Sequence, residues 1–308
     1  MTLAAPEAQR LATALATVAA VPVTPFGADG AVDLAAHARL ISRMVEDGIS
    51  VITPNGNTGE FYTLTPDEAR SIAESAIKAA GGRAEVLAGV GHDIPGAVAA
   101  GQHAQDIGAK MIMVHQPVSP YLSADGWVDY HRAIAGALPD LGVVLYIRDA
   151  RITGRHIGRL GELCPNVIGV KYGVRDPIQF AAVARDAGPD RFTWLAGQAE
   201  RTAPACWSAG ASGFTSGLVN VAPQLALAML GSLRDGDMAG AMKTWELIRP
   251  FEDLRAADSS ADTVSVVKEA LAQLGLCRAD VRPPSRRLPE PLRARIGDIL
   301  ASWGRATA

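Results

Sequence analysis

Eight short runs of β-forming residues alternate with longer, alanine-rich segments of helical periodicity, and this alternation limits the possible folds more than any other feature. A regular β-then-α order indicates parallel strands joined by helical crossovers. Eight such units are the number that a closed barrel requires, so we predict an α/β fold, the (β/α)8 TIM barrel. The predicted strands are Ala19–Thr24, Ile49–Pro54, Glu85–Gly91, Lys110–His115, Val143–Arg148, Val167–Tyr172, Phe192–Gly197 and Gly213–Gly217.

Two helix starts support this count. Thr65-Pro66-Asp67-Glu68 is a capping box with proline in the first helical position, and Ser123 is a good N-cap residue after the fourth predicted strand. A doubly wound open sheet is the alternative fold. No GxGxxG motif follows the first predicted strand and the chain has no P-loop, so the barrel is favoured.

The chain is longer than a barrel needs, since it has 308 residues and a barrel takes roughly 250. We predict a leading helix within residues 1–18, the barrel over 19–222, and a C-terminal helical extension over 223–308 that packs on the barrel. The predicted helical stretches outside the barrel are Ala5–Thr17, Pro223–Leu233, Met238–Arg255, Ala261–Leu274 and Pro289–Trp303, with a Pro/Arg-rich linker at Val281–Leu288.

Composition and charge exclude several classes of protein. The net charge of −3 leaves no basic surplus for a nucleic-acid partner. No uncharged apolar stretch is long enough to cross a membrane, and Glu7 and Arg10 precede any apolar run, which argues against a signal peptide. The cysteines lie far apart without a CxxC pair, which favours a reducing compartment. We expect a cytoplasmic protein without nucleic-acid or membrane partners.

Lys171 is the leading candidate for chemistry, because catalytic residues in a barrel lie at the C-terminal ends of the strands. Strand side chains alternate, so Val167, Gly169 and Lys171 should share the inward face. Burial disfavours an ammonium group, and the neutral amine that results can attack a carbonyl carbon. The alternative is a lysine at a strand end whose tip lies in solvent; we favour the nucleophile.

Tyr146 and Arg148 share a face of the preceding predicted strand and should point inward beside Lys171. A phenol there can transfer protons, and an arginine can hold a carboxylate by two parallel hydrogen bonds. A core tyrosine and a surface pair of Arg148 with Asp149 would fit the same pattern, and this alternative stays open.

Weaker signals come from two loops. Two glycines in Asn55–Glu60 let backbone N–H groups approach an anion, and Thr58 adds a hydroxyl, although a plain turn would look the same. Ser216, after the eighth predicted strand, is a weaker candidate for substrate binding at the barrel mouth, and His115 ends the fourth predicted strand. The six histidines form no HxH or HExxH spacing, so no metal site is predicted, although dispersed carboxylates could still form one.

The strand ends and several loops, taken in order, resemble the dihydrodipicolinate synthase/N-acetylneuraminate lyase superfamily of class I aldolases. The resemblance covers nearly the whole chain, and the order and spacing of its segments make it specific. The segments are Val21–Phe26, Gly56–Glu60, Leu145-Tyr146, Gly169–Lys171, Asn220–Pro223, Val266–Lys268 and Val281–Pro284.

The resemblance implies roles for these residues. Lys171 would form the Schiff base and Tyr146 would relay protons, while Asn57, Thr58 and Gly59 would bind the carboxylate of a 2-oxo acid. Members of the family are commonly homotetramers, so a homo-oligomer, tetramer or dimer, is expected. They need no dissociable cofactor.

Departures from the family pattern bear on the substrate. The synthase branch usually has a threonine where Asn57 stands, and it draws on a tyrosine after the fourth strand, where this chain has Val118 and Ser119. Tyr121 is not clearly equivalent, so His115, Ser119 and Tyr121 all remain candidates for the missing relay. Arg151 could match the carboxylate-binding arginine of that branch.

The 5-dehydro-4-deoxyglucarate dehydratase branch is a nearer match at Tyr146–Asp149, Pro120–Leu122 and Thr215-Ser216, although it usually has asparagine at Ile147 and aspartate at Tyr172. The leading hypothesis is a lyase that dehydrates or cleaves a 2-oxo-3-deoxy sugar acid. The alternatives are a 4-hydroxy-tetrahydrodipicolinate synthase-type condensation of pyruvate, a non-catalytic ligand-binding member of the superfamily, and a metal-dependent barrel aldolase.

Overall fold

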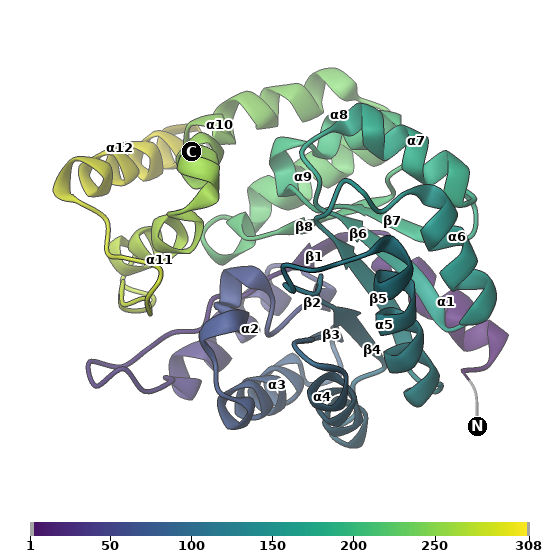
Figure 1. Ribbon diagram of the computed structural model, residues 1–308. Coiled ribbons are helices and arrows are strands. Elements are labelled where there is room, and N and C mark those ends of the chain that lie inside the picture. The colour runs from purple at the N-terminus through teal and green to yellow at the C-terminus, as the bar shows by residue number, and fades with distance from the viewer. Residues whose placement is uncertain (1–2, 307–308) are drawn as a thin grey trace.

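Eight parallel strands pair in chain order and close into a barrel in the computed structural model, which describes residues 3–306 (Figure 1). β8 pairs with β1 and closes the ring, with Thr215 opposite Ala19. The predicted fold is therefore confirmed. The strands are β1 Val18–Ala20, β2 Val51–Ile52, β3 Glu85–Val90, β4 Met111–Val114, β5 Gly142–Ile147, β6 Val167–Tyr172, β7 Thr193–Ala196 and β8 Gly213–Ser216.

Several strands end earlier than predicted, and β1 shows the largest difference at its C-terminal end. β1 ends at Ala20 rather than Thr24, since the Val23 N–H donates to the side chain of Asn220 at 2.9 Å. The same asparagine donates to the carbonyl of Val21 at 2.9 Å. The segment after β1 is thus tied to the loop after β8 rather than to β2.

The helices follow the strands and surround the barrel (Figure 1). The predicted capping box is present, with the Thr65 side chain accepting from the Glu68 N–H and the Glu68 carboxylate accepting from the Thr65 N–H. The Ser123 side chain likewise caps its helix by accepting from the Gly126 N–H. The helices are α1 Ala5–Leu15, α2 Leu34–Glu46, α3 Pro66–Ala80, α4 Ile94–Asp106, α5 Ala124–Ala137, α6 Gly154–Leu163, α7 Pro177–Ala187, α8 Ala203–Ser208 and α9 Pro223–Arg234.

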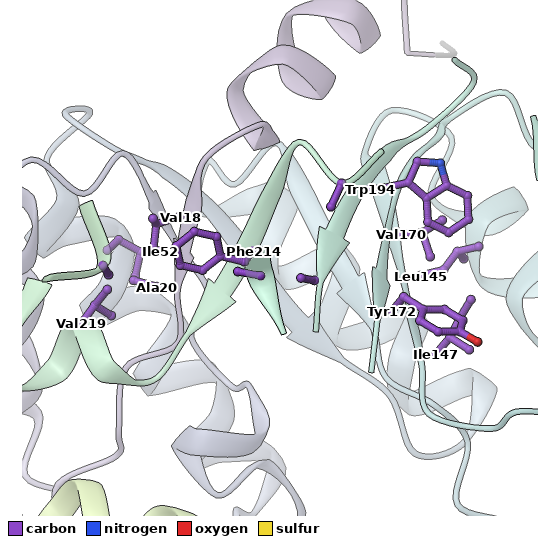
Figure 2. Packing of buried hydrophobic residues seen from close by; sticks show 14 of the residues in the cluster. Val18, Ala20, Ile52, Leu145, Ile147, Val170, Tyr172, Trp194, Phe214 and Val219 are labelled. Atoms are coloured by element: carbon purple, nitrogen blue, oxygen red, sulfur yellow. The ribbon is translucent and has the colours of Figure 1, made fainter. Parts of the chain in front are cut away.

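The barrel has two apolar layers. The outer layer lies between strands and helices, and Figure 2 shows Leu145, Val170 and Tyr172 within it. The inner layer includes Val51, Leu87, Met111 and Val144. Leu11 and Leu15 of α1 are fully buried in this same inner cluster, so the leading helix closes the N-terminal end of the barrel.

One prediction about strand facing is wrong. Val167 packs in the outer layer and Ile168 in the inner one, whereas the alternation had placed Val167 inward. The cause is a register shift between β5 and β6: Val143 pairs with Val167 but Val144 pairs with Gly169, which leaves Ile168 as an extra residue. Beyond this bulge Lys171 regains the inward face.

The C-terminal extension contains α10 Met238–Ser260, α11 Thr263–Gln273 and α12 Glu290–Ala306 (Figure 1). The helical backbone of α10 breaks after Ala256, where Ala257 is extended and Asp258 and Ser259 have positive φ. α11 packs against the 3-10 turn η1 Asn57–Gly59 in the loop after β2. The domain boundaries at 18 and 222 stay a prediction. Residues 1–2 of the predicted leading segment and residues 307–308 of the predicted extension lie outside the described part of the chain.

Candidate active site

Lys171 and Tyr146 are neighbours across the barrel wall. They pair in register on β6 and β5, and the Lys171 Nζ lies 4.0 Å from the centroid of the Tyr146 ring. Both side chains are buried, with 3% and 5% of their surface exposed. The sequence-based expectation that they point inward together agrees with this arrangement.

Burial makes Lys171 an unusually weak base. Loss of hydration and, to a smaller extent, the positive charge of Arg148 together lower its pKa to about 7. Within residues 3–306 no carboxylate forms an ion pair with Lys171 that would restore the charged form. In a large fraction of the molecules, Lys171 is therefore a neutral amine near pH 7, and the neutral amine is the nucleophilic form.

Asn57 holds the phenol oxygen of Tyr146 in place through a hydrogen bond. Its amide Nδ2 donates to the Tyr146 Oη at 3.2 Å, so the phenol keeps its own proton available to a substrate or to the amine. Burial raises the pKa of Tyr146 and keeps the phenol protonated. The Asn57 Oδ1 is buried without a protein partner in the described chain, so it can accept a hydrogen bond from a ligand.

A cavity of about 210 Å³ opens above these groups at the C-terminal end of the barrel. Its walls come from the loops after several strands and from the end of α10, where the helix breaks. Residues of the cavity wall that carry polar groups include Asn57, Thr58, Arg148, Gln198, Thr215 and Arg255. This is the end at which barrel enzymes carry out chemistry.

Gly59 does not line this cavity but shapes its loop. A Cβ atom at Gly59 would lie 3.1 Å from the carbonyl oxygen of Pro22, and the Gly59 carbonyl accepts from Thr24 Oγ1 at 2.7 Å. Glycine is therefore needed for the close approach of two backbones. The other two residues of this turn, Asn57 and the buried Thr58, line the cavity.

Two of the predicted substrate-binding residues point elsewhere. Arg151 lies outside the cavity wall, because its guanidinium pairs with Asp149 at 2.6 Å in a side chain that is 66% exposed. Ser216 is fully buried behind the wall, where its hydroxyl donates to Glu200. The preceding residue, Thr215, lines the cavity instead, since neighbouring strand residues face opposite sides.

Comparison with known proteins assigns the family. The profile of the Dihydrodipicolinate synthetase family matches residues 14–302, almost the whole chain. The chain belongs to this family. The resemblance inferred from the strand ends is thereby confirmed, and family membership together with the names of the relatives indicates an enzyme of the lyase type.

The relatives carry two different names at similar identity. A probable 5-dehydro-4-deoxyglucarate dehydratase from Rhodococcus opacus is 30% identical over 283 residues, covering 91% of this chain and 92% of that protein. A 4-hydroxy-tetrahydrodipicolinate synthase from Hyphomonas neptunium is 33% identical over 289 residues, covering 92% and 96%. The crystal structure of dihydrodipicolinate synthase from Bacillus clausii is 39% identical with a TM-score of 0.92, covering 96% and 99%.

His115 sits at the site but cannot serve as an acid near neutral pH. Burial lowers its pKa to about 3, so the imidazole is neutral. The ring stacks on Phe61 at 4.0 Å between centroids and lies 5.7 Å from the ring of Tyr146. Its Nε2 is 2.8 Å from the Asn55 carbonyl, which fixes the ring. His115 therefore shapes the wall behind Tyr146.

The other two relay candidates also lie away from Lys171. Tyr121 is 94% exposed, and Ser119 accepts a hydrogen bond from the Tyr121 N–H at 3.3 Å. The sequence analysis missed Tyr62, which packs against His115 at 5.7 Å and whose hydroxyl donates to the Gln116 carbonyl at 3.4 Å. The pair Phe61-Tyr62 directly after Glu60 was the signal that could have indicated it.

Glu60, the last residue of the Gly56–Glu60 segment, ties the loop after β2 to the C-terminal extension. Glu60 has a φ of 61°, and its carboxylate accepts from the buried ammonium of Lys268 and from the Arg282 N–H at 2.9 Å. The Lys268 Nζ and the Arg282 Cζ also lie 4.0 and 4.3 Å from the Phe26 ring centroid. Four segments of the resemblance thus meet at one point and hold the loop that carries Asn57.

Two charged residues of the cavity were not anticipated. Glu252 and Arg255, one turn apart on α10, are both buried and pair at 2.6 Å. Behind them lies Glu200, whose pKa is raised to about 8 by burial and by the charge of Glu252. No linear pattern indicates that the end of α10 folds over the barrel mouth.

The described residues, 3–306, include no group of three or more His, Cys, Asp or Glu side chains arranged to hold a metal ion. Within the same residues, no helix is both long and apolar enough to cross a membrane.

Proposed function

We propose that this family member is a Schiff-base-forming lyase that acts on a small 2-oxo acid, with Lys171 as the nucleophile. The observation that carries the proposal is the buried amine of Lys171, which forms no ion pair within residues 3–306, lies 4.0 Å from the ring of Tyr146 and has a pKa lowered to about 7. A neutral amine beside a proton donor is what imine formation requires.

The proposed reaction begins with attack of the Lys171 nitrogen on C2 of the 2-oxo acid. Tyr146 returns a proton to the oxygen of the carbinolamine, which then leaves as water and gives an iminium ion. Loss of a C3 proton forms an enamine. The enamine can expel the C4 hydroxyl, which takes up a proton and leaves as water. Alternatively, the C4 hydroxyl gives its proton to the Tyr146 phenolate and becomes an aldehyde, while the C3–C4 bond breaks and its electron pair turns the iminium ion into the enamine.

The charge of the cavity supports an anionic substrate. Its wall holds five basic side chains, Lys171, Arg148, Arg175, Arg201 and Arg255, and one carboxylate, Glu252. Thr58 and Asn57 would bind the C1 carboxylate, and Arg148 at the mouth would bind a distal hydroxyl or carboxylate. We therefore propose a 2-oxo-3-deoxy sugar acid as substrate, in keeping with the dehydratase names of several relatives.

A condensation that uses pyruvate is the second candidate. The 39% identity to the Bacillus clausii synthase favours it. Against it, the loop after β4 supplies no cavity-lining tyrosine, and Tyr121 projects into solvent. Turnover assays with 2-oxo-3-deoxy sugar acids and with pyruvate plus an aldehyde would separate the two reactions.

The Schiff base is tested by borohydride reduction with a panel of 2-oxo acids, pyruvate first, followed by intact and peptide mass spectrometry. We expect a ligand-sized mass gain on the peptide that contains Lys171. Lys171→Ala should abolish the adduct, while the exposed Lys243→Ala should retain it. An adduct on another lysine, or none from folded protein, would refute the mechanism.

We also propose a homo-oligomer, a cytoplasmic location and no dissociable cofactor. Support for oligomerisation comes from the exposed apolar groups of Val118 and Tyr121 at the cavity end, since such groups often mark interfaces. Light scattering of the purified protein should give a mass of two or four chains. Turnover should be unaffected by EDTA, whereas a metal-dependent aldolase would lose activity.

A further inference from the structure

A guanidinium group from the C-terminal extension is buried in the wall of the catalytic cavity. Arg255 lies near the end of α10, two residues before the helical backbone breaks at Ala257, and only 8% of it is exposed. It shares the cavity with Lys171 and Thr58. A buried cation that faces a reaction cavity needs an explanation, because removing such a group from water is costly.

Gly217 makes the room for this guanidinium. A Cβ atom at Gly217 would lie 2.5 Å from Nη2 and 3.1 Å from Cζ of Arg255, so no other residue fits there without displacing the arginine. The same point is 3.3 Å from the hydroxyl of Thr58. The guanidinium therefore lies beside the loop proposed to bind the C1 carboxylate.

Only one side of the guanidinium is engaged. Its Nη1 donates to Glu252 at 2.6 Å, which fixes the plane of the group. Nε is buried without a partner, and Nη2 forms no hydrogen bond within residues 3–306. Nε and Nη2 form one edge of the planar group, and such an edge can donate to both oxygens of a carboxylate.

We propose that Arg255 is a specificity-determining residue that binds the C1 carboxylate of the substrate together with Thr58. The cation selects 2-oxo acids over neutral ketones and aldehydes at the point where C2 meets Lys171. This inference rests on the proposed Schiff-base function and adds a charged partner to a loop that otherwise offers only neutral groups. Glu252 acts as a positioning residue for the guanidinium.

A purely structural ion pair between Glu252 and Arg255 is the competing explanation. Residues three apart on a helix commonly pair without any role in binding. The two explanations differ in what they predict for substrates. Loss of a structural pair changes the reaction with every carbonyl compound alike, whereas loss of a carboxylate partner affects only compounds that carry a carboxylate.

The test compares borohydride trapping of pyruvate with that of hydroxyacetone, in which a neutral CH₂OH group replaces the carboxylate. In Arg255→Met we expect the concentration of pyruvate needed for half-maximal trapping to rise about 10- to 100-fold, the range of one charged hydrogen-bonding partner. The concentration of hydroxyacetone needed should not change. Arg249→Met, an exposed residue on the same helix, is the matched control and should leave both unchanged.

Gly217→Ala provides a second variant in case Arg255→Met unfolds. This variant keeps the charge of Arg255 but places a methyl group 2.5 Å from its Nη2. It should weaken the trapping of pyruvate and leave that of hydroxyacetone unchanged. An equal loss for both compounds in the two variants would overturn the proposal.

Binding of lactate, which cannot form an imine, separates this proposal from the proposed function. Lactate affinity, measured by ligand-observed NMR, should fall in Arg255→Met even if no compound is ever trapped. Absence of trapping with this result would refute the Schiff base alone. Equal lactate affinity in wild type and variant would refute the role of Arg255.

Discussion

Lys171 and Lys268 are two buried lysines with nearly the same local geometry and opposite consequences. Lys171 is 3% exposed and Lys268 is fully buried, and the ammonium nitrogen of each lies 4.0 Å from an aromatic centroid, Tyr146 in one case and Phe26 in the other. Burial lowers the pKa of both side chains. Neither burial nor the aromatic ring distinguishes them.

The difference lies in the remaining partners. Lys268 donates to the Glu60 carboxylate and to the Asp280 carbonyl at 2.8 Å, and the charge of Glu60 raises its pKa against the effect of burial. No carboxylate in the described part of the chain pairs with Lys171, and its charged neighbour is Arg148, which lowers its pKa further. The comparison supports the proposal that Lys171 is the nucleophile, because the partners that favour a charged amine surround Lys268 instead.

Replacing Lys171 should have the largest effect on activity and the opposite effect on stability. Lys171→Met should lower kcat/KM by at least about 10⁴-fold, as removal of a covalent nucleophile does. It should also raise the free energy of unfolding at pH 7 by on the order of 3 kcal/mol, because a depressed lysine pKa is a cost of folding below pH 10.5. Urea denaturation checks this, and an unchanged or lower stability would contradict the assigned pKa.

Breaking the other site should reverse that pattern. Lys268→Met leaves the Glu60 carboxylate buried without its cation and should lower the free energy of unfolding by about 3 kcal/mol. Any loss of activity should appear mainly in KM, since the loop that carries Asn57 and Thr58 is displaced. The double variant with Glu60→Gln should recover part of the stability. If Lys268→Met is no less stable than wild type, the contrast between the two lysines fails.

Removing only the phenol oxygen tests the aromatic partner of Lys171. Tyr146→Phe keeps the ring beside Nζ but loses the proton donor, so turnover should fall about 100-fold. The adduct with pyruvate should still form, more slowly. Phe26→Tyr, at the ring beside Lys268, is the matched control, and it should not lower turnover by a comparable factor.

The smallest effect is expected from pH. Since the neutral amine attacks, the rate of trapping should rise about tenfold per pH unit below pH 7 and level off above it, because the pKa of Lys171 is about 7. A lysine with the ordinary value of 10.5 would show a rise that continues to pH 10. Rapid-quench trapping of pyruvate between pH 5.5 and 9.5 distinguishes the two.

The fold could be predicted because each βα unit carries its own signal, such as the Thr65 capping box or the Ser123 cap. Side-chain direction was harder. Alternation placed Lys171 and Tyr146 correctly, but the extra residue Ile168 shifted Val167 to the outer layer. Strand periodicity contains no information about a bulge that arises from pairing with the neighbouring strand.

The parts of the site that come from distant segments could not be predicted at all. Arg255 and Glu252 are three residues apart on a helix far along the chain from Lys171, and they line the cavity only because the end of α10 packs over the barrel mouth. The family resemblance suggested Arg151 as a carboxylate-binding residue, whereas its guanidinium pairs with Asp149 two residues earlier. Local competition of this kind depends on loop conformation, which a linear pattern does not specify.

The contact between Glu60 and Lys268 also sets an order in time. A ribosome completes β8 at Ser216 before it adds Lys268 and Arg282, so the barrel can close while the Glu60 carboxylate still lacks both partners. The contacts between the extension and the loop with Asn57 and Thr58 can form only after the extension has been added. A nascent or clipped chain that ends before residue 268 would therefore keep Lys171 but lack the two contacts that hold Glu60 beside Asn57 and Thr58.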